Sequence, residues 1–130
     1  GITYQQPLEV VPDPRVAASA SDLELQYMAS MRCYEQYHLL ESLKEALVLS
    51  DRSEAEKEAL IGKGQPGAQD FIYGSIYKMQ KDNLQIVPLQ NQYLFVLTIL
   101  QSADDKPTIS ALDAINQLEE LTEQLKQRIN

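Results

Sequence analysis

The feature that most constrains this chain is a stretch from Leu23 to Leu49 that contains neither glycine nor proline. Apolar residues recur along it in two runs with steps of three and four, at Leu23, Tyr27, Met31 and Tyr34 and then at Leu40, Leu43 and Leu47, the outer two of which are seven apart. Such steps follow the period of an α-helix. The pattern therefore predicts one long helix from Ser21 to about Ser50, about 43 Å long at 1.5 Å per residue.

Both the start and the width of this helix can be argued from single residues. Ser21 and Glu24 have the spacing of a capping box, in which each side chain bonds to the other residue's backbone N–H. Further apolar residues widen the stripe on several sides, namely Leu25, Met28, Cys33, Tyr37, Leu39 and Leu49. A wide stripe indicates a helix that packs on more than one side. We expect the long helix to be the spine of the fold.

Two shorter helices are expected next. Ser53 and Glu56 repeat the capping-box spacing and predict a short helix that ends near Gly62 or Gly64, because glycine favours helix C-termini. A third helix is predicted over residues 68–81, with Ile72, Ile76 and Met79 on one face.

The last third of the chain predicts two more helices. Pro88 suits the first turn of a helix, and the apolar run 93–100 continues it. A buried strand is the alternative for so short a run, but no second strand is predicted to pair with it. The final helix has an apolar stripe from Ile109 to Ile129, with Ser110 and Asp113 as a capping box or Thr108 as the cap instead.

The fold expected from these segments is all-α. It is a four- to five-helix, up-and-down-like bundle over residues 21–130, preceded by an extended arm over residues 1–20. Pro7, Pro12 and Pro14 favour extended backbone in the arm. Apolar residues lie between them, so the arm is expected to pack on its own bundle or on a partner.

Charge and composition exclude several classes of protein. The formal net charge is −8, which argues against direct nucleic-acid binding and against docking on an anionic membrane. No apolar run approaches the roughly 18 residues of a membrane span. The single cysteine, Cys33, allows no internal disulfide and assigns no compartment. The chain starts with Gly1, so a removed leader and an added residue both stay open.

No catalytic or cofactor-binding signature is present. Cys33 and His38 are five residues apart, about 140° around a helix, so they cannot form a nucleophile–base pair there. The spacing Gly62-x-Gly64-x-x-Gly67 matches a dinucleotide loop but has no strand before it. We therefore expect no cofactor and no enzyme.

One metal-binding alternative rests on Glu35 and His38. A Glu-x-x-His pair on a helix places both side chains on one face, as in di-iron carboxylate bundles. Such sites require a second pair and further glutamates. With one histidine in the chain, a complete site would require a homodimer.

The remaining features favour a protein-interaction module, such as an accessory, adaptor or assembly and export helper factor. Tyrosine is common at interfaces because it has a large apolar ring and a polar tip. The candidate partner-binding residues are Tyr4, Leu8, Val10, Tyr27, Tyr34, Tyr37, Tyr73 and Tyr77. The partner is another protein or a second copy. An acidic inhibitor that mimics nucleic acid is a further alternative, although Lys and Arg are interspersed among the acidic residues.

Overall fold

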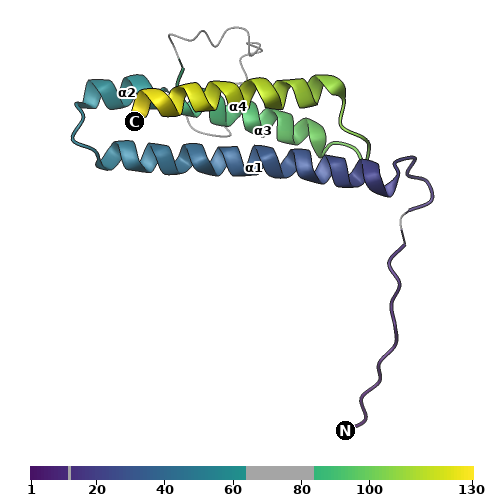
Figure 1. Cartoon of the computed structure of the whole chain (residues 1–130). Coiled ribbons are helices and arrows are strands. Elements are labelled where there is room, and N and C mark those ends of the chain that lie inside the picture. The colour runs from purple at the N-terminus through teal and green to yellow at the C-terminus, as the bar shows by residue number, and fades with distance from the viewer. Residues whose placement is uncertain (12, 64–83) are drawn as a thin grey trace.

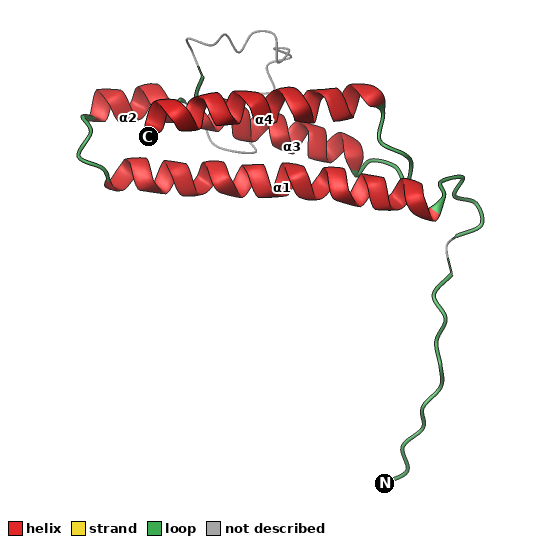
Figure 2. Ribbon diagram, in the orientation of Figure 1, coloured by secondary structure: helices red, strands yellow, loops and turns green. Residues whose placement is uncertain are grey.

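The computed structural model describes residues 1–11, 13–63 and 84–130. In these ranges it contains four helices and no strand: α1 (Ala20–Leu49), α2 (Glu54–Ile61), α3 (Ile86–Leu100) and α4 (Ile109–Ile129) (Figure 2). The predicted all-α class is confirmed. The strand alternative for residues 93–100 is wrong, since they belong to α3. The helix predicted over 68–81, with Tyr73 and Tyr77, lies outside the described residues.

The helices form a bundle around α1 (Figure 1). The side-chain amide of Gln26, near the start of α1, donates to the carbonyl of Leu100 at the end of α3, so these two helices run antiparallel. Arg32 and Arg52 contact successively later parts of α4, at Glu119 and Ile129, so α1 and α4 run parallel. The core between the three long helices includes Leu40, Leu47, Leu89, Tyr93, Ile115, Leu118 and Leu125.

The long helix begins two residues earlier than expected. Ser19, not Ser21, is the N-cap: its Oγ accepts from the Asp22 N–H, and Asp22 Oδ2 accepts from the Ser19 N–H at 3.0 Å. Ser19 and Ser21 both have an acidic residue three positions later. Starting at Ser19 lengthens the helix and adds a bond between the two serine hydroxyls, at 2.9 Å. The predicted Ser21–Glu24 box is therefore wrong.

The expected breadth of the α1 stripe is only partly realised in the packing. A narrow line of Ala29, Cys33, Leu40 and Leu47 is buried, and α1 contacts both α3 and α4. Leu25, Met28 and Leu49, which widened the predicted stripe, are exposed among the described residues. A large part of the apolar surface of α1 is thus not used by the packing of these helices.

The short helix α2 follows the sequence prediction at both ends. Ser53 and Glu56 form the predicted capping box, and Gly62 is the C-cap with φ 85° and ψ 176°. This backbone region is essentially restricted to glycine. Gln85, just before α3, reaches back and donates to the Ala59 carbonyl at 3.1 Å, which ties the end of α2 to the start of α3.

We expect Gly62→Ala to lower the free energy of unfolding by about 1–3 kcal/mol, because alanine does not tolerate this backbone conformation. A Cβ at this position would also meet Gln85 Oε1 at 2.9 Å. Urea unfolding followed by circular dichroism measures the change. A Cβ at position 62 would also meet Gln85 Cβ at 3.0 Å, so the cost should persist in a Gln85→Gly background, which removes both atoms, and a cost near zero there would contradict the backbone explanation.

The starts of α3 and α4 agree with the sequence prediction at one residue and differ from it at another. Pro88 lies in the first turn of α3, as predicted. Thr108 caps α4 by accepting from the Ala111 N–H at 3.1 Å, so the Thr108 alternative is confirmed and the Ser110–Asp113 box is wrong. Ile109 is consequently the first helical residue and is 79% exposed rather than part of the buried stripe.

Residues 1–11 contain no helix or strand, and all of them are exposed. Figure 1 shows this segment leading away from the bundle. A local clamp follows it, in which the Arg15 guanidinium donates to both carboxylate oxygens of Asp13 and the Val16 N–H donates to the Asp13 carbonyl. No helix among the described residues is long and apolar enough to cross a membrane.

Candidate functional site

A cleft of about 200 Å³ lies between the middle of α1 and the middle of α3. Its lining among the described residues comes from Cys33, Tyr34, Tyr37 and His38 of α1 and from Tyr93, Leu94 and Leu97 of α3. We call this the aromatic cleft. It arises because α1 and α3 pack along the buried line of α1, so the residues just beside that line form its walls.

The floor of the aromatic cleft is fixed by a buried hydrogen-bond chain. The Thr122 hydroxyl of α4 donates to the Leu118 carbonyl at 2.8 Å, and the Tyr93 hydroxyl lies 2.8 Å from the same Thr122 oxygen. Thr122 has one hydroxyl proton, so Tyr93 donates to Thr122. Burial raises the pKa of Tyr93, so its hydroxyl stays protonated and serves as a structural anchor.

Cys33 is also part of the floor and is almost completely buried. Burial raises the pKa of its thiol to about 11. A thiol is a nucleophile or metal ligand only as the thiolate. Cys33 therefore behaves as a small apolar side chain.

The rim of the aromatic cleft is an aromatic cluster on α1. The Tyr34 and His38 rings lie 4.3 Å apart between centroids, and the Tyr37 ring meets His38 edge-on at 5.6 Å. Aromatic pairs at such distances favour tilted and edge-on arrangements. Tyr34 is 52% exposed. The cleft thus presents ring faces and aliphatic side chains, with polar groups at its edge.

A polar contact continues the same seam one helical turn further along. Gln90 of α3 is fully buried, and its Nε2 donates to Glu41 Oε2 of α1 at 2.7 Å. Glu41 also accepts from Lys44 Nζ at 3.0 Å. These contacts, the Gln90 bond first, hold the pKa of Glu41 below its ordinary value of 4.5. The other amide atom, Gln90 Oε1, has no hydrogen-bond partner in the described part of the chain.

We expect Gln90→Leu to raise the pKa of Glu41 toward 4.5, because the hydrogen bond that stabilises its charged form is lost. Carbon-13 NMR titration of the carboxyl group measures the shift, and Lys44→Met should raise the pKa less. Because the pKa of Glu41 is lower in the folded state, its charged form stabilises the fold at pH values above the ordinary pKa of 4.5. This stabilisation is lost as the pH falls through the pKa of the folded state. The part of the stability difference between wild type and Gln90→Leu that comes from Glu41 should therefore shrink on acidification. An unchanged Glu41 pKa in Gln90→Leu would contradict this assignment.

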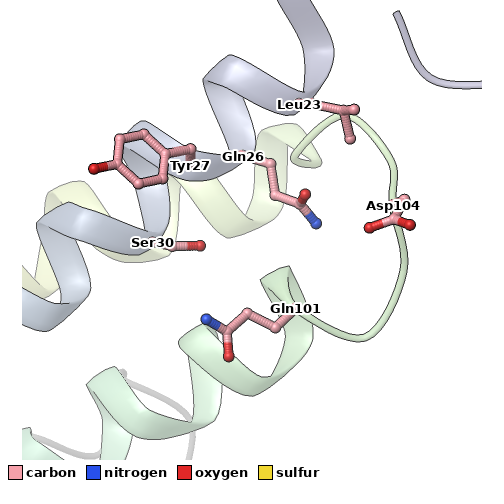
Figure 3. Close-up of a pocket in the computed structure, with 6 residues that line it drawn as sticks. All are labelled: Leu23, Gln26, Tyr27, Ser30, Gln101 and Asp104. Atoms are coloured by element: carbon pink, nitrogen blue, oxygen red, sulfur yellow. The ribbon is translucent and has the colours of Figure 1, made fainter. Parts of the chain in front are cut away.

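A second, more polar hollow lies at the N-terminal end of α1 (Figure 3). Leu23, Gln26, Tyr27 and Ser30 of α1 line it together with Gln101 and Asp104. The Gln26 amide is already engaged, since it donates to the carbonyls of Leu100, the last residue of α3, and Ala103, in the α3–α4 connection. Helix C-termini need such donors. We assign this hollow a structural role in holding the α3–α4 connection against α1.

The sequence-predicted residues are thus distributed over several places. Tyr34 and Tyr37 lie together in the aromatic cleft, whereas Tyr27 lies at the second hollow. Tyr4, Leu8 and Val10 are exposed on the segment before α1.

Sequence reasoning missed Leu94 and Leu97, which line the aromatic cleft from α3. The apolar run 93–100 predicted the helix that carries them, but not the packing of α3 against α1 that leaves them half-exposed. The sequence offered one sign that this side of α3 is not wholly apolar. Gln90 lies on the same side, one turn before Leu94 and two turns before Leu97.

The described residues place no further metal-ligating side chain with Glu35 and His38, the pair on which the metal-binding alternative rests. His38 belongs to the aromatic cluster and Glu35 is exposed. Over residues 1–11, 13–63 and 84–130, no group of three or more His, Cys, Asp or Glu side chains is placed to hold a metal ion.

No protein-family model, no curated protein and no solved structure matches this chain.

Proposed function

We propose that this protein is a non-enzymatic protein-interaction module, an accessory, adaptor or assembly and export helper factor. The observation that carries the proposal is the aromatic cleft, whose walls are apolar and whose rim is tyrosine and histidine. Its volume of about 200 Å³ is below the roughly 300–1,000 Å³ of pockets that enclose small-molecule ligands. It suits an anchor side chain of a protein partner, which typically fills a small, well-packed pocket.

The chemistry of the cleft supports binding rather than catalysis. Its thiol and its buried phenol both have raised pKa values and stay protonated near neutral pH. Exposed apolar side chains on α1 add contact area, namely Tyr27 and Met28. Exposed apolar surface of this kind marks interaction sites.

The acidic-mimic alternative has less support. Acidic residues on α2 and α4 are paired with cations, as in Glu54–Lys57, Glu119–Arg32 and Glu123–Lys126. A mimic of nucleic acid needs a face of unpaired negative charge that complements a basic groove.

Affinity capture from the native cells with four forms of the tagged chain tests the proposal. Leu97→Asp places a charge in the aromatic cleft, and Ile99→Asp makes the same change two residues along, on an exposed face of α3 outside the cleft. We expect specific proteins to be captured by wild type and Ile99→Asp and depleted at least tenfold with Leu97→Asp. Leu97→Ala, which shortens the same side chain without adding a charge, serves as a second cleft variant in case Leu97→Asp misfolds. Equal capture by all forms, with circular dichroism confirming their fold, would refute the proposal.

A further inference from the structure

The segment before α1 and the aromatic cleft have complementary properties. Residues 1–11 carry five apolar side chains, Ile2, Tyr4, Leu8, Val10 and Val11, each 66–88% exposed. Glu9 is the one charged side chain among them. We call these eleven residues the apolar arm. It is an extended apolar segment without a packing partner among the described residues, and the aromatic cleft is an apolar receptor that the described helices leave open.

We infer that the apolar arm of one chain docks along the aromatic cleft of a second copy, so that two chains exchange arms in a symmetric dimer. This inference rests on the proposed function, for which it names the partner. Exchange of an identical element between two chains is a common route to dimers, and it uses both surfaces of each chain in one closed arrangement.

The area involved is sufficient for a stable dimer. Burying five side chains of this size removes on the order of 600 Å² of apolar surface from each arm. Two arms together with the surface they cover then bury on the order of 2,400 Å², above the roughly 1,200–2,000 Å² of a standard stable interface. An arm docked within its own chain would bury the same area per chain, so the choice between the two arrangements rests on the direction of the arm.

The direction of the arm favours a second copy over the same chain. The clamp of Asp13 and Arg15, with the turn closed by the Val16 N–H, lies between the arm and α1. Figure 1 shows residues 1–11 leading away from the bundle of their own chain. In this direction the arm meets a neighbouring molecule.

Disulfide trapping between differently labelled chains tests the inference. All chains carry Cys33→Ala. One carries Leu8→Cys on the arm, a second carries Tyr34→Cys at the rim of the cleft, and a third carries Glu120→Cys on an exposed position of α4. The second and third are nitrogen-15 labelled, so mass spectrometry identifies each adduct after equilibration in a glutathione redox buffer. Leu8 and Tyr34 are 88% and 52% exposed, so neither change threatens the fold.

We expect the mixed adduct of Leu8→Cys with Tyr34→Cys to exceed its adduct with Glu120→Cys at least tenfold. Equal yields with the two labelled chains would overturn the inference. A chain that carries both Leu8→Cys and Tyr34→Cys gives a second test. If it forms an intramolecular disulfide at every dilution while the mixture gives no adduct, the arm docks within its own chain and the inference is overturned. If trapping fails but Leu97→Asp still abolishes capture of other proteins, the proposed function stands and only the second copy is excluded.

Discussion

Tyr93→Ala is expected to lower the free energy of unfolding by about 3–5 kcal/mol, the range for removing a buried aromatic side chain. Tyr93 is 1% exposed in the core between the three long helices. Its removal deletes the floor of the aromatic cleft and takes away the donor that bonds Thr122. Since small domains are stable by about 5–15 kcal/mol, this single change removes a large share of the total. Urea unfolding at one fixed protein concentration measures it.

Tyr34→Ala is the matched control for Tyr93→Ala. It removes the same side chain from the same cleft, but at the exposed rim, so its cost should stay within about 0.5–1 kcal/mol. A cost for Tyr34→Ala equal to that for Tyr93→Ala would contradict the division of the cleft into a structural floor and a binding rim.

Leu40→Ala is expected to cost about 2–5 kcal/mol, because it leaves a cavity in a close-packed core. Leu40 is fully buried on α1. The effect should appear as a lower urea midpoint with an unchanged slope, because unfolding exposes nearly the same surface.

Leu49→Ala tests whether burial, rather than residue type, decides this cost. Leu49 is on the same helix but is 86% exposed, so the same substitution should cost no more than about 0.5 kcal/mol. Similar costs at positions 40 and 49 would show that the packing of α1 differs from the one described.

Local signals predicted the helices well because they depend on neighbours in the sequence. The Ser53–Glu56 box, Gly62 at the end of α2 and Pro88 in the first turn of α3 are all decided by local backbone chemistry. The same signals failed where two caps competed. Ser19 and Ser21 have equivalent patterns, and the choice between them depends on one additional half-turn of helix.

The aromatic cleft was predictable only in part. Periodicity placed Tyr34 in the α1 stripe and Tyr37 among the residues that widen it. It could not identify Leu94 and Leu97 as their partners, because that pairing depends on how α3 lies against α1. The same limit explains Ile109, which matches the period of α4 but falls in its exposed first turn.

Photocrosslinking from position 34 tests the central claim most directly, namely that the aromatic cleft is the interaction surface. A benzophenone amino acid replaces Tyr34, which keeps an aromatic ring at the rim, and a second chain carries it at Glu120 on an exposed position of α4. Both are expressed in the native cells and irradiated. The account predicts a discrete protein adduct from position 34, of twice the chain mass if a second copy is bound, and none from position 120. No discrete adduct from position 34, or the same adducts from both positions, would contradict it.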